Sequence, residues 1–334
     1  MRILGIETSC DETAAAVVEN GIKVESNAIA TTKEIFSDLG GVVPEDAARR
    51  QVECILPVVH TALKEAGVSM DDIDMIAVTK GPGLLGSLLV GISAARTIAS
   101  IHNKPLIGVH HTLGHLSSIW LDATTEPQFP CITLSASGGH TDLWLRTSHT
   151  EGELLGKTRD DAAGEAFDKG AAMLGLPYPG GPSISDASQD GNELKYKLPI
   201  ALKGEDTLDF SFSGLKTALK YTIRDVEDAQ VPDLAASYQL AICTQLCDRI
   251  VRAVKNHKAK EVHLVGGVSA NIRLRSLVEQ ELGDVSLRVP KKISYCTDNA
   301  AMIAAAGHAL YETYGSDAAK DFVSSATLRL EECD

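Results

Sequence analysis

The sequence predicts an α/β protein that consists of two similar lobes with a ligand held between them. At 334 residues the chain is too long for one compact core and suits two domains of ordinary size. Two arrangements of elements also occur twice, in the same order: a β-hairpin with a polar turn, and then a strand, a glycine-rich loop and a helix. Because element order repeats rather than residue identity, the pattern indicates two lobes of like topology.

The first copy of the pattern occupies the N-terminal third of the chain. The polar turn Cys10–Thr13 joins its first two strands, and Gly40-Gly41 interrupt the chain before Pro44 opens a helix with acidic residues in its first turn. We expect strands at residues 2–9, 14–18, 24–31, 74–79 and 105–109, and helices at about 44–66 and 84–101.

The second copy begins after residue 130. We expect strands at 131–136, 143–145 and 261–265, a helix that begins near 270 and another at 300–310. The Pro-, Gly- and Ser-rich segment 178–213 reads as loop and short helix. We therefore predict an N-terminal lobe at 1–110, completed by a C-terminal helix at about 298–325, and a second lobe at 111–297 with an insertion at about 178–232.

Composition narrows the class of protein. The 31 basic and 45 acidic residues give a net charge of −14, which argues against non-specific binding to nucleic acid. Any RNA substrate must be met by a local basic patch or by a partner protein. No apolar run approaches the roughly 20 residues of a membrane helix, so we expect no membrane association. An acid at Glu7 comes too early for a signal peptide.

The seven cysteines are scattered and form no CxxC pair. Cys243 and Cys247 are four residues apart in a helical segment, but no second Cys/His pair matches them. We therefore expect buried free thiols rather than a zinc site, and a reducing compartment, the cytoplasm.

A candidate metal site begins at His111 and His115. If a helix starts after the strand at 105–109, these histidines lie on one face at i and i+4 and can bind one divalent ion. Spacing alone leaves open that they are surface or capping residues. Asp298, before the Ala-rich helix, is the third candidate ligand, although an Asp there also suits a helix N-cap. Thr112 replaces the Glu of an HExxH protease, so peptide hydrolysis lacks its base.

Candidate phosphate contacts lie in the second half of the chain. The turn Ser137–Thr141 contains two glycines, which let backbone N–H groups approach an anion, although a simple hairpin turn reads the same way. Asp161 suggests a helix cap, and Asp168 lies on the same face and could accept from ribose hydroxyls. Pro179–Pro182 reads as a rigid turn. Asn271 follows Gly266-Gly267 and could contact the nucleotide, although it also suits an N-cap.

Taken in order, these segments resemble the tRNA N6-adenosine threonylcarbamoyltransferase family (TsaD), bacterial type. The resemblance runs from residue 1 to about 310. It is carried by the following segments: residues 6–13, 40–45, 81–84, 110–115, 137–141, 161–169, 178–182, 210–217, 266–271 and 296–300.

The resemblance implies the actin-like ATPase fold and a specific reaction. The family transfers a threonylcarbamoyl group from threonylcarbamoyl-AMP to N6 of adenosine 37 in tRNAs that read codons starting with A, and AMP is released. It implies metal ligands at His111, His115 and Asp298, with Fe²⁺ first and Zn²⁺ as the alternative. The nucleotide, including ATP or AMP, would contact the following residues: Ser135, Ala136, Ser137, Gly138, Gly139, Asp168, Gly181, Ser185 and Asn271. It also implies a TsaB-like homologue and a TsaE-like ATPase as partners beside the tRNA.

Two positions depart from the family pattern. Many bacterial members carry Glu where this chain has Leu113, and many have Asp where it has Ser185, which weakens a ribose contact there. Asp11 and Glu12 are candidates for moving the proton of the amine. Two other functions remain open from sequence: a non-catalytic nucleotide-binding scaffold of the same complex, and a small-molecule kinase of the same fold.

Overall fold

The computed structural model describes residues 1–31, 43–226 and 229–330, so the predicted break at Gly40-Gly41 lies outside the described residues. The chain forms two compact units, of which the first contains Met1–Glu126 and Pro290–Asp334 and the second Pro127–Val289. The boundary that the sequence predicts for the first lobe follows residue 110. Residues 111–126 instead belong to the first unit, as does the C-terminal helix.

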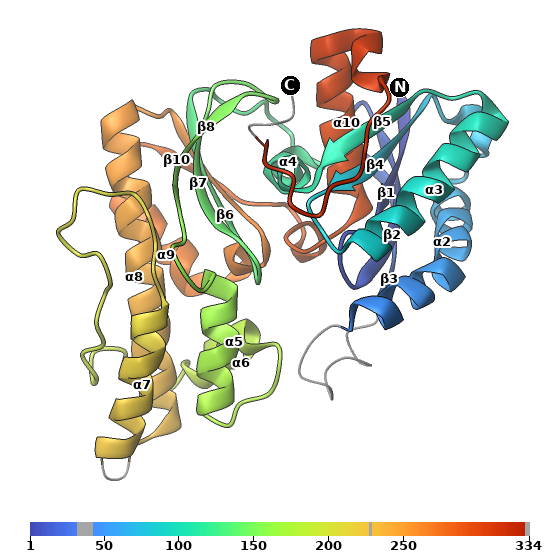
Figure 1. The fold of residues 1–334 in the computed structure, drawn as a ribbon. Helices are drawn as coiled ribbons and strands as arrows, with labels where there is room; N and C mark the ends of the chain where they lie inside the picture. Colours follow the sequence, from blue (N-terminus) through green and yellow to red (C-terminus); the bar gives the residue numbers. More distant parts are fainter. Residues whose placement is uncertain (32–42, 227–228, 331–334) are drawn as a thin grey trace. The chain divides into compact units, whose positions relative to one another are not determined.

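A five-stranded mixed sheet forms the centre of the first unit, in the order β3-β2-β1-β4-β5 (Figure 1). β1 pairs with β2 in antiparallel fashion and with β4 in parallel, and β1 and β2 are almost wholly buried. The strands have these bounds: β1 Arg2–Glu7, β2 Glu12–Glu19, β3 Lys23–Thr31, β4 Met75–Gly81 and β5 Leu106–His110.

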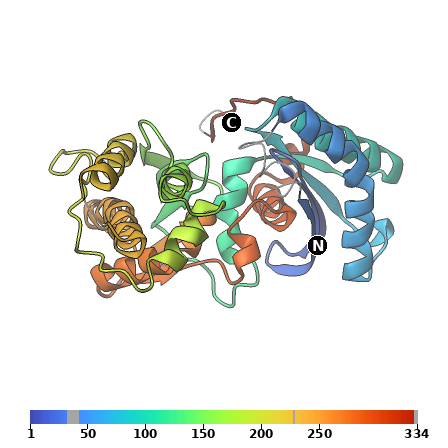
Figure 2. The same cartoon turned by 90° about the horizontal axis from the view of Figure 1, so that it is seen from below.

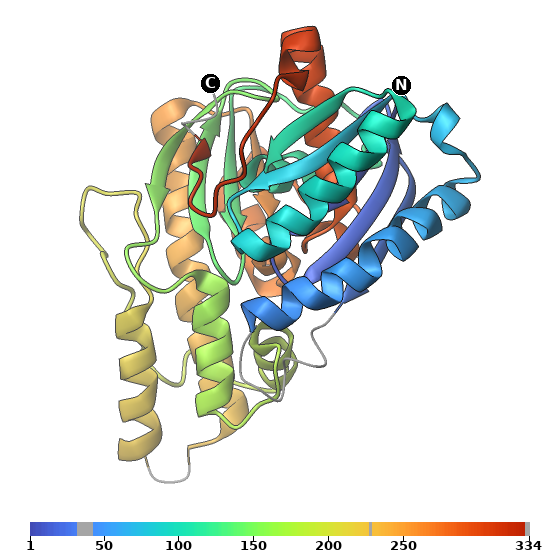
Figure 3. The ribbon, with the colours of Figure 1, turned by 45° about the vertical axis from the view of Figure 1, so that its right-hand side comes forward.

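Helices cover both faces of this sheet. α2 (Pro44–Ala66) and α3 (Leu85–His102) lie on one face, and α10 (Ala300–Tyr314) lies on the other (Figures 2 and 3). α10 follows from an N-cap at Asn299 and an Ala-rich sequence that can approach the sheet closely. The shorter helices of this unit have these bounds: η1 Met70–Asp72, α4 His111–Ser117, η2 Ser118–Trp120, η4 Ile293–Tyr295 and η5 Gly315–Ala319.

Within the described part of the chain, α3 is the one helix long and apolar enough to cross a membrane by length and composition. The sequence predicts no apolar run of this length, and α3 departs from that prediction by its length and composition. Its Leu88, Ile92 and Ala95 are buried in the core against the first sheet. These contacts account for the apolar residues on the buried face of α3, while Leu85, Leu89 and Ile101 are exposed.

The second unit repeats the topology of the first. Its sheet has the order β10-β9-β6-β7-β8, in which β6 pairs antiparallel with β7 and parallel with β9, as β1 does with β2 and β4. The predicted repeat of element order is thereby confirmed. The strands have these bounds: β6 Cys131–Ala136, β7 Thr141–Arg146, β8 Gly152–Lys157, β9 Glu261–Val265 and β10 Ser286–Arg288.

The largest helix of the second unit is α8 (Val231–His257), which packs against β6 and β7 and buries Tyr238, Ile242 and Leu246. α5 and α6 pack against each other and against α8 (Figure 1). Segment 178–213 is loop with one short helix, as predicted. The remaining helices have these bounds: α5 Ala163–Met173, α6 Gly180–Ala187, α7 Ser213–Asp225, η3 Gly267–Ala270 and α9 Ile272–Leu282.

The second unit buries a charged cluster around Glu261 at the start of β9. The Glu261 carboxylate accepts from the Gln128 N–H at 3.0 Å and lies 2.9 Å from His263 Nε2 and 3.1 Å from the Nη2 of the Arg288 guanidinium. Burial raises the pKa of Glu261, but the hydrogen bonds from His263 and Gln128 outweigh it and lower the value to about 2. The folded protein therefore stabilises the ionised carboxylate.

This cluster predicts how stability depends on pH. An unfolded Glu has a pKa of about 4.3, so the stabilisation is fully present above that pH and is lost as the pH falls toward 2. We expect Glu261→Gln to lower the free energy of unfolding at pH 7 and to lower it less at pH 3, in urea titrations. Glu153→Gln, at an exposed position of β8, is the control and should change neither value. An equal loss for Glu261→Gln at both pH values would contradict the assignment.

Candidate functional site

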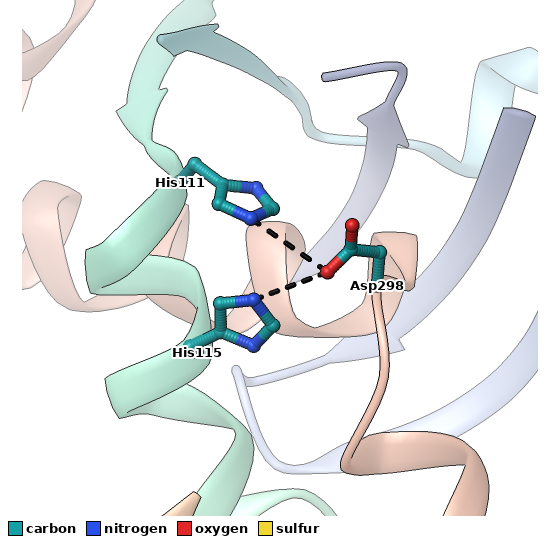
Figure 4. Close-up of side chains that lie close together, drawn as sticks. All are labelled: His111, His115 and Asp298. Atoms are coloured by element: carbon teal, nitrogen blue, oxygen red, sulfur yellow. Dashed lines mark ion pairs between the residues drawn. The ribbon is translucent and has the colours of Figure 1, made fainter. Parts of the chain in front are cut away.

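The three predicted metal ligands lie together in the first unit. The His110 side chain accepts from the Thr112 N–H at 3.1 Å and so caps α4, which makes His111 the first residue of the helix and places His115 one turn later. Nε2 of His111 and Nε2 of His115 lie 3.6 and 3.1 Å from the same Oδ1 of Asp298 (Figure 4). Both histidines are buried. The structure therefore supports ligands rather than surface histidines.

Asp298 is not the N-cap of α10. That position belongs to Asn299, whose side-chain oxygen accepts from the Met302 N–H at 3.0 Å. The capping alternative for Asp298 is therefore wrong, because the neighbouring residue satisfies the orphan backbone donor. The Asp298 carboxylate is left to point at the two imidazoles (Figure 4).

Glu7 also belongs to this site, and sequence analysis missed it as a functional residue. It ends β1 and is 1% exposed, and its Oε2 lies 3.1 Å from His111 Nδ1. The Ser9 N–H and the Thr79 hydroxyl both donate to the same carboxylate. The available signal was an acid at the end of an otherwise apolar central strand, since buried acids are rare unless paired.

The charges of this cluster shift its pKa values. Burial lowers the pKa of His111, but the Glu7 and Asp298 carboxylates outweigh it and raise the value to about 9. Burial raises the pKa of Glu7, but His111 outweighs it and holds that value below the usual range. A positive charge placed between Glu7 and Asp298 is thus favoured, whether it comes from a proton or from a metal ion.

The ligand atoms of His111, His115 and Asp298 all lie within 4.8 Å of one another. Two imidazole nitrogens and one carboxylate oxygen form a set that suits Fe²⁺ or Zn²⁺ and leaves other positions open for a substrate. A hard cation such as Mg²⁺ prefers oxygen ligands and fits this set poorly. The donor set therefore fits a transition-metal ion. Leu113 is buried on the same helix and lies two residues from each histidine, a spacing that places it off their shared face.

Asp11 lies in the turn between β1 and β2 and is partly exposed, and Glu12 is the buried first residue of β2. Gln51 of α2 fixes this turn, since its amide donates to the Cys10 and Glu12 carbonyls at 2.9 and 3.1 Å. The turn is therefore rigidly held. No residue of the turn is shown to move a proton, so that role stays a prediction.

The predicted phosphate turn has room for an anion. Ser135 and Ala136 end β6, and a β-carbon at Gly138 or Gly139 would meet no atom within 4 Å. The α5 N-terminus lies against this turn, because the Gly164 N–H donates to the Ser137 carbonyl at 3.1 Å. A β-carbon on Gly164 would lie 2.5 Å from that carbonyl oxygen, so only glycine fits there. An open Gly-Gly turn beside a helix N-terminus suits a phosphate.

Asp168 connects two helices of the second unit. Its carboxylate accepts from the Gly180 N–H at 2.7 Å, and burial raises its pKa. The predicted rigid turn at Pro179–Pro182 is wrong from Gly180 onward, because α6 begins there after its N-cap Pro179, and Asp168 accepts from the first N–H of that helix. Gly181 has open space around its α-carbon, and Ser185 is partly buried one turn further along α6.

Two capping predictions had different outcomes. Asn271 is the N-cap of α9: its Oδ1 accepts from the Leu274 N–H at 2.9 Å, and its Nδ2 donates to Gln239. Asp161 does not cap α5, since it forms an ion pair with Lys169 and the Thr141 hydroxyl accepts from the Ala163 N–H instead. Cys243 and Cys247 are buried free thiols, as predicted.

Comparisons with known proteins bear on the whole chain. A family model described as TsaD, tRNA N6-adenosine threonylcarbamoyltransferase, matches residues 23–305. A protein of that name from Listeria innocua is 49% identical, covering 91% of this chain and 90% of its own length. One from Bacillus cereus is 48% identical, covering 93% and 91%.

Solved structures of much lower identity share the fold. Component A of the (R)-2-hydroxyglutaryl-CoA dehydratase of Acidaminococcus fermentans matches with a TM-score of 0.55 at 14% identity, covering 96% of this chain and 100% of its own. HypF from T. kodakarensis matches with a TM-score of 0.63 at 15% identity, covering 95% of this chain and 48% of its own. These neighbours confirm the predicted actin-like ATPase fold. The family model and the curated relatives show that the chain belongs to the tRNA N6-adenosine threonylcarbamoyltransferase family.

Proposed function

We propose that this chain transfers the threonylcarbamoyl group from threonylcarbamoyl-AMP to N6 of adenosine 37 in tRNAs that read codons starting with A. The observation that carries the proposal is the His111–His115–Asp298 set, with both histidines buried and the carboxylate partly exposed, in a chain of this family. A non-catalytic scaffold would not need that set, and a kinase would need carboxylates around Mg²⁺ in its place. Both alternatives are therefore disfavoured.

The chemistry of the reaction defines what the protein must supply. The donor is a mixed carbamic–phosphoric anhydride, so AMP is already a good leaving group. The exocyclic amine of adenine is a weak nucleophile because its lone pair is delocalised into the ring. The N6–carbonyl bond forms, the bond from the carbonyl carbon to the phosphate oxygen breaks, and one proton leaves the amine. Orientation and polarisation of the carbonyl matter more than a strong base.

The first unit is proposed to hold the threonylcarbamoyl end of the donor. His111, His115 and Asp298 would bind Fe²⁺, with Zn²⁺ as the alternative, and the ion would supply Lewis acidity and a template for the donor's oxygens. Asp11 in the turn before β2 and Glu12 at the start of β2, a segment that Gln51 holds, are the proposed acceptors or relays of the amine proton. A carboxylate can take the amine proton only if the N6 nitrogen of adenosine becomes acidic as its bond to the carbonyl carbon forms.

The second unit is proposed to hold the AMP end. The Gly138 N–H and the α5 N-terminus would contact the phosphate, with Ser135, Ala136, Ser137 and Gly139 lining the turn beside it. The Ser137 N–H already donates to the His140 carbonyl and the Gly139 N–H to the Ser137 hydroxyl. Asp168, Gly181, Ser185 and Asn271 are the proposed ribose and base contacts. Asn271 already donates to Gln239 and accepts from the Leu274 N–H, so only its second amide hydrogen and a second lone pair on its oxygen are available to the nucleotide. ATP or AMP would occupy the same contacts.

Partners are proposed from the family and from charge. The net charge of −14 makes strong binding of tRNA by this chain alone unfavourable, so a TsaB-like homologue and a TsaE-like ATPase are proposed to contribute to RNA binding. We propose the cytoplasm as the location, where tRNA is modified and thiols stay reduced.

The test of the function is direct. The chain, both partners and a threonylcarbamoyl-AMP synthase would be incubated with labelled threonine, ATP, bicarbonate and unmodified tRNA. Nucleoside mass spectrometry should then detect threonylcarbamoyladenosine, and omission of the chain should abolish it. Formation of the nucleoside without this chain, or phosphorylation of a small molecule in its place, would reject the proposal.

A further inference from the structure

We propose that Glu7 is a positioning residue that fixes the tautomer of His111 and so presents the His111 Nε2 lone pair to the metal ion. The proposal rests on the metal-dependent function proposed above. It starts from the two sides of one ring: Nδ1 of His111 lies 3.1 Å from Glu7 Oε2, and Nε2 lies 3.6 Å from Asp298 Oδ1. A metal-bound imidazole needs its other nitrogen protonated.

The contacts of the Glu7 carboxylate show that it accepts the hydrogen bond that it shares with His111. Oε1 accepts from the Ser9 N–H and Oε2 accepts from the Thr79 hydroxyl, both at 2.5 Å. An ionised carboxylate only accepts hydrogen bonds, so Nδ1 of His111 must be the donor in the third contact. The Ser9 hydroxyl, 3.2 Å from the same Nδ1, can accept as well and does not change this assignment. With Nδ1 held as a donor to Glu7, Nε2 is the nitrogen that can give up its proton to a metal ion and serve as the ligand atom.

The position of Glu7 makes this arrangement specific. The side chain is 1% exposed at the end of a central strand, and His111 and Thr79 lie on different elements, α4 and β4. A carboxylate buried there solely to bridge β1 and β4 would not need to contact an imidazole. His115 has no such partner: its Nδ1 is buried without a hydrogen bond in the structure. Of the two histidines, His111 is therefore the one whose ring orientation is fixed by a hydrogen bond to a carboxylate.

The variant Glu7→Gln tests the proposal with almost no change in shape. An amide has one acceptor oxygen and one NH₂ donor. If the oxygen accepts from Ser9, the NH₂ faces His111 and favours a proton on Nε2, where the metal should bind. If the oxygen faces His111, two donors meet at Ser9. We expect the Kd for Zn²⁺ or Co²⁺, measured by competition with a chelator, to rise roughly 10- to 100-fold.

Controls separate this role from a general loss of structure. Glu25→Gln removes a partly buried charge from β3 of the same unit, paired with Arg2 rather than with the histidines, and should leave the metal Kd unchanged. A folded Glu7→Gln protein that binds the metal as the wild type does would overturn the proposal. Loss of metal with undiminished transfer would overturn the metal-dependent function but leave the role of Glu7 standing.

A measurement on the wild type covers the case in which Glu7→Gln does not fold. In the Zn²⁺-loaded protein with ¹⁵N-labelled histidine, the His111 ring should show a protonated Nδ1 and a metal-shifted Nε2. The His111→Ala protein identifies that signal by its absence. A metal-shifted Nδ1 with a proton on Nε2 would overturn the proposal.

A separate observation concerns α7, where we infer a contact surface for the phosphate backbone of the RNA substrate. Lys216, Lys220 and Arg224 follow one another at four-residue intervals and so form one basic stripe. Leu215 and Leu219 occupy the buried face beside it. The stripe stands out in a chain with a net charge of −14.

The surroundings of α7 favour RNA as the occupant. Tyr221 is 51% exposed on the same helix with the Arg224 guanidinium 4.8 Å from its ring centroid, and such an aromatic side chain can stack with an unpaired base. Asp160 holds the start of α7 by accepting from the Phe212 and Ser213 N–H groups. α7 also packs against α5, the helix that carries Asp168. Asp225, paired with Arg224, is the acid at the far end of the stripe.

Charge reversal tests the stripe in the complex with its proposed partners. We expect Lys216→Glu with Lys220→Glu to weaken binding of the tRNA roughly 10-fold or more at moderate salt and to reduce the salt dependence of binding. Lys255→Glu with Lys258→Glu makes the same change of charge at the exposed end of α8 and should have a much smaller effect. Equal effects of the two pairs of substitutions would overturn the inference that the stripe contacts the tRNA. Absence of tRNA binding by the wild-type complex would overturn the stripe and the proposed function together.

Discussion

His115→Ala should remove the bound metal and lower transfer of the threonylcarbamoyl group by more than about 100-fold, a larger loss than that expected from a residue outside the ligand set. Its Nε2 lies 3.1 Å from Asp298, and one imidazole and one carboxylate cannot replace the complete set. The measurements are metal content per folded chain and formation of threonylcarbamoyladenosine.

His115 gives a cleaner test than His111, because His111 also contacts Glu7 and Ser9 and its loss would disturb both. His60→Ala is the matched control: the same substitution at an exposed position of α2 should leave metal content and transfer unchanged. A metal-free His115→Ala protein with full transfer activity would show that the metal has no part in the reaction.

Local patterns in the sequence predicted most of the fold. The bounds of β6, β9 and α2 agree with the segments expected, because apolar strands next to turn residues and a Pro-led helix leave little choice. The repeated element order also predicted the matching topology of the two sheets. The lobe boundary was placed too early, since nothing in residues 111–126 marks which sheet they pack against.

The candidate site was predictable in part. The spacing of His111 and His115 indicated a shared face, but spacing could not decide between ligands and surface residues. Assignment of Asp298 depended on which of two adjacent residues caps α10, and Asp298 and Asn299 are both good caps. Glu7 was missed because its function depends on a contact with a residue 104 positions away in the chain. Such contacts follow from the topology of the sheet rather than from any local pattern.

Gly5→Ala should destabilise the protein and disturb the metal site together, although Gly5 touches no ligand. A β-carbon at Gly5 would lie 2.2 Å from the Ala300 carbonyl oxygen and 3.0 Å from the Ala304 amide nitrogen, both in the backbone of α10. Backbone cannot move aside as a flexible side chain can, so the start of α10 must shift away from β1. We expect a loss of about 2–4 kcal/mol in the free energy of unfolding, measured in urea.

The same shift should reach Asp298, which lies two residues before Ala300 in the chain, and so should weaken metal binding in the protein that remains folded. Gly214→Ala is the control, because a β-carbon there meets no atom within 4 Å and alanine favours the helix by up to about 1 kcal/mol. Destabilisation with an unchanged metal Kd would mean that the strain is absorbed within α10 beyond its first turn. Unchanged stability would mean that β1 and α10 can separate without cost, which the burial of Ala300, Ala301 and Ala304 argues against.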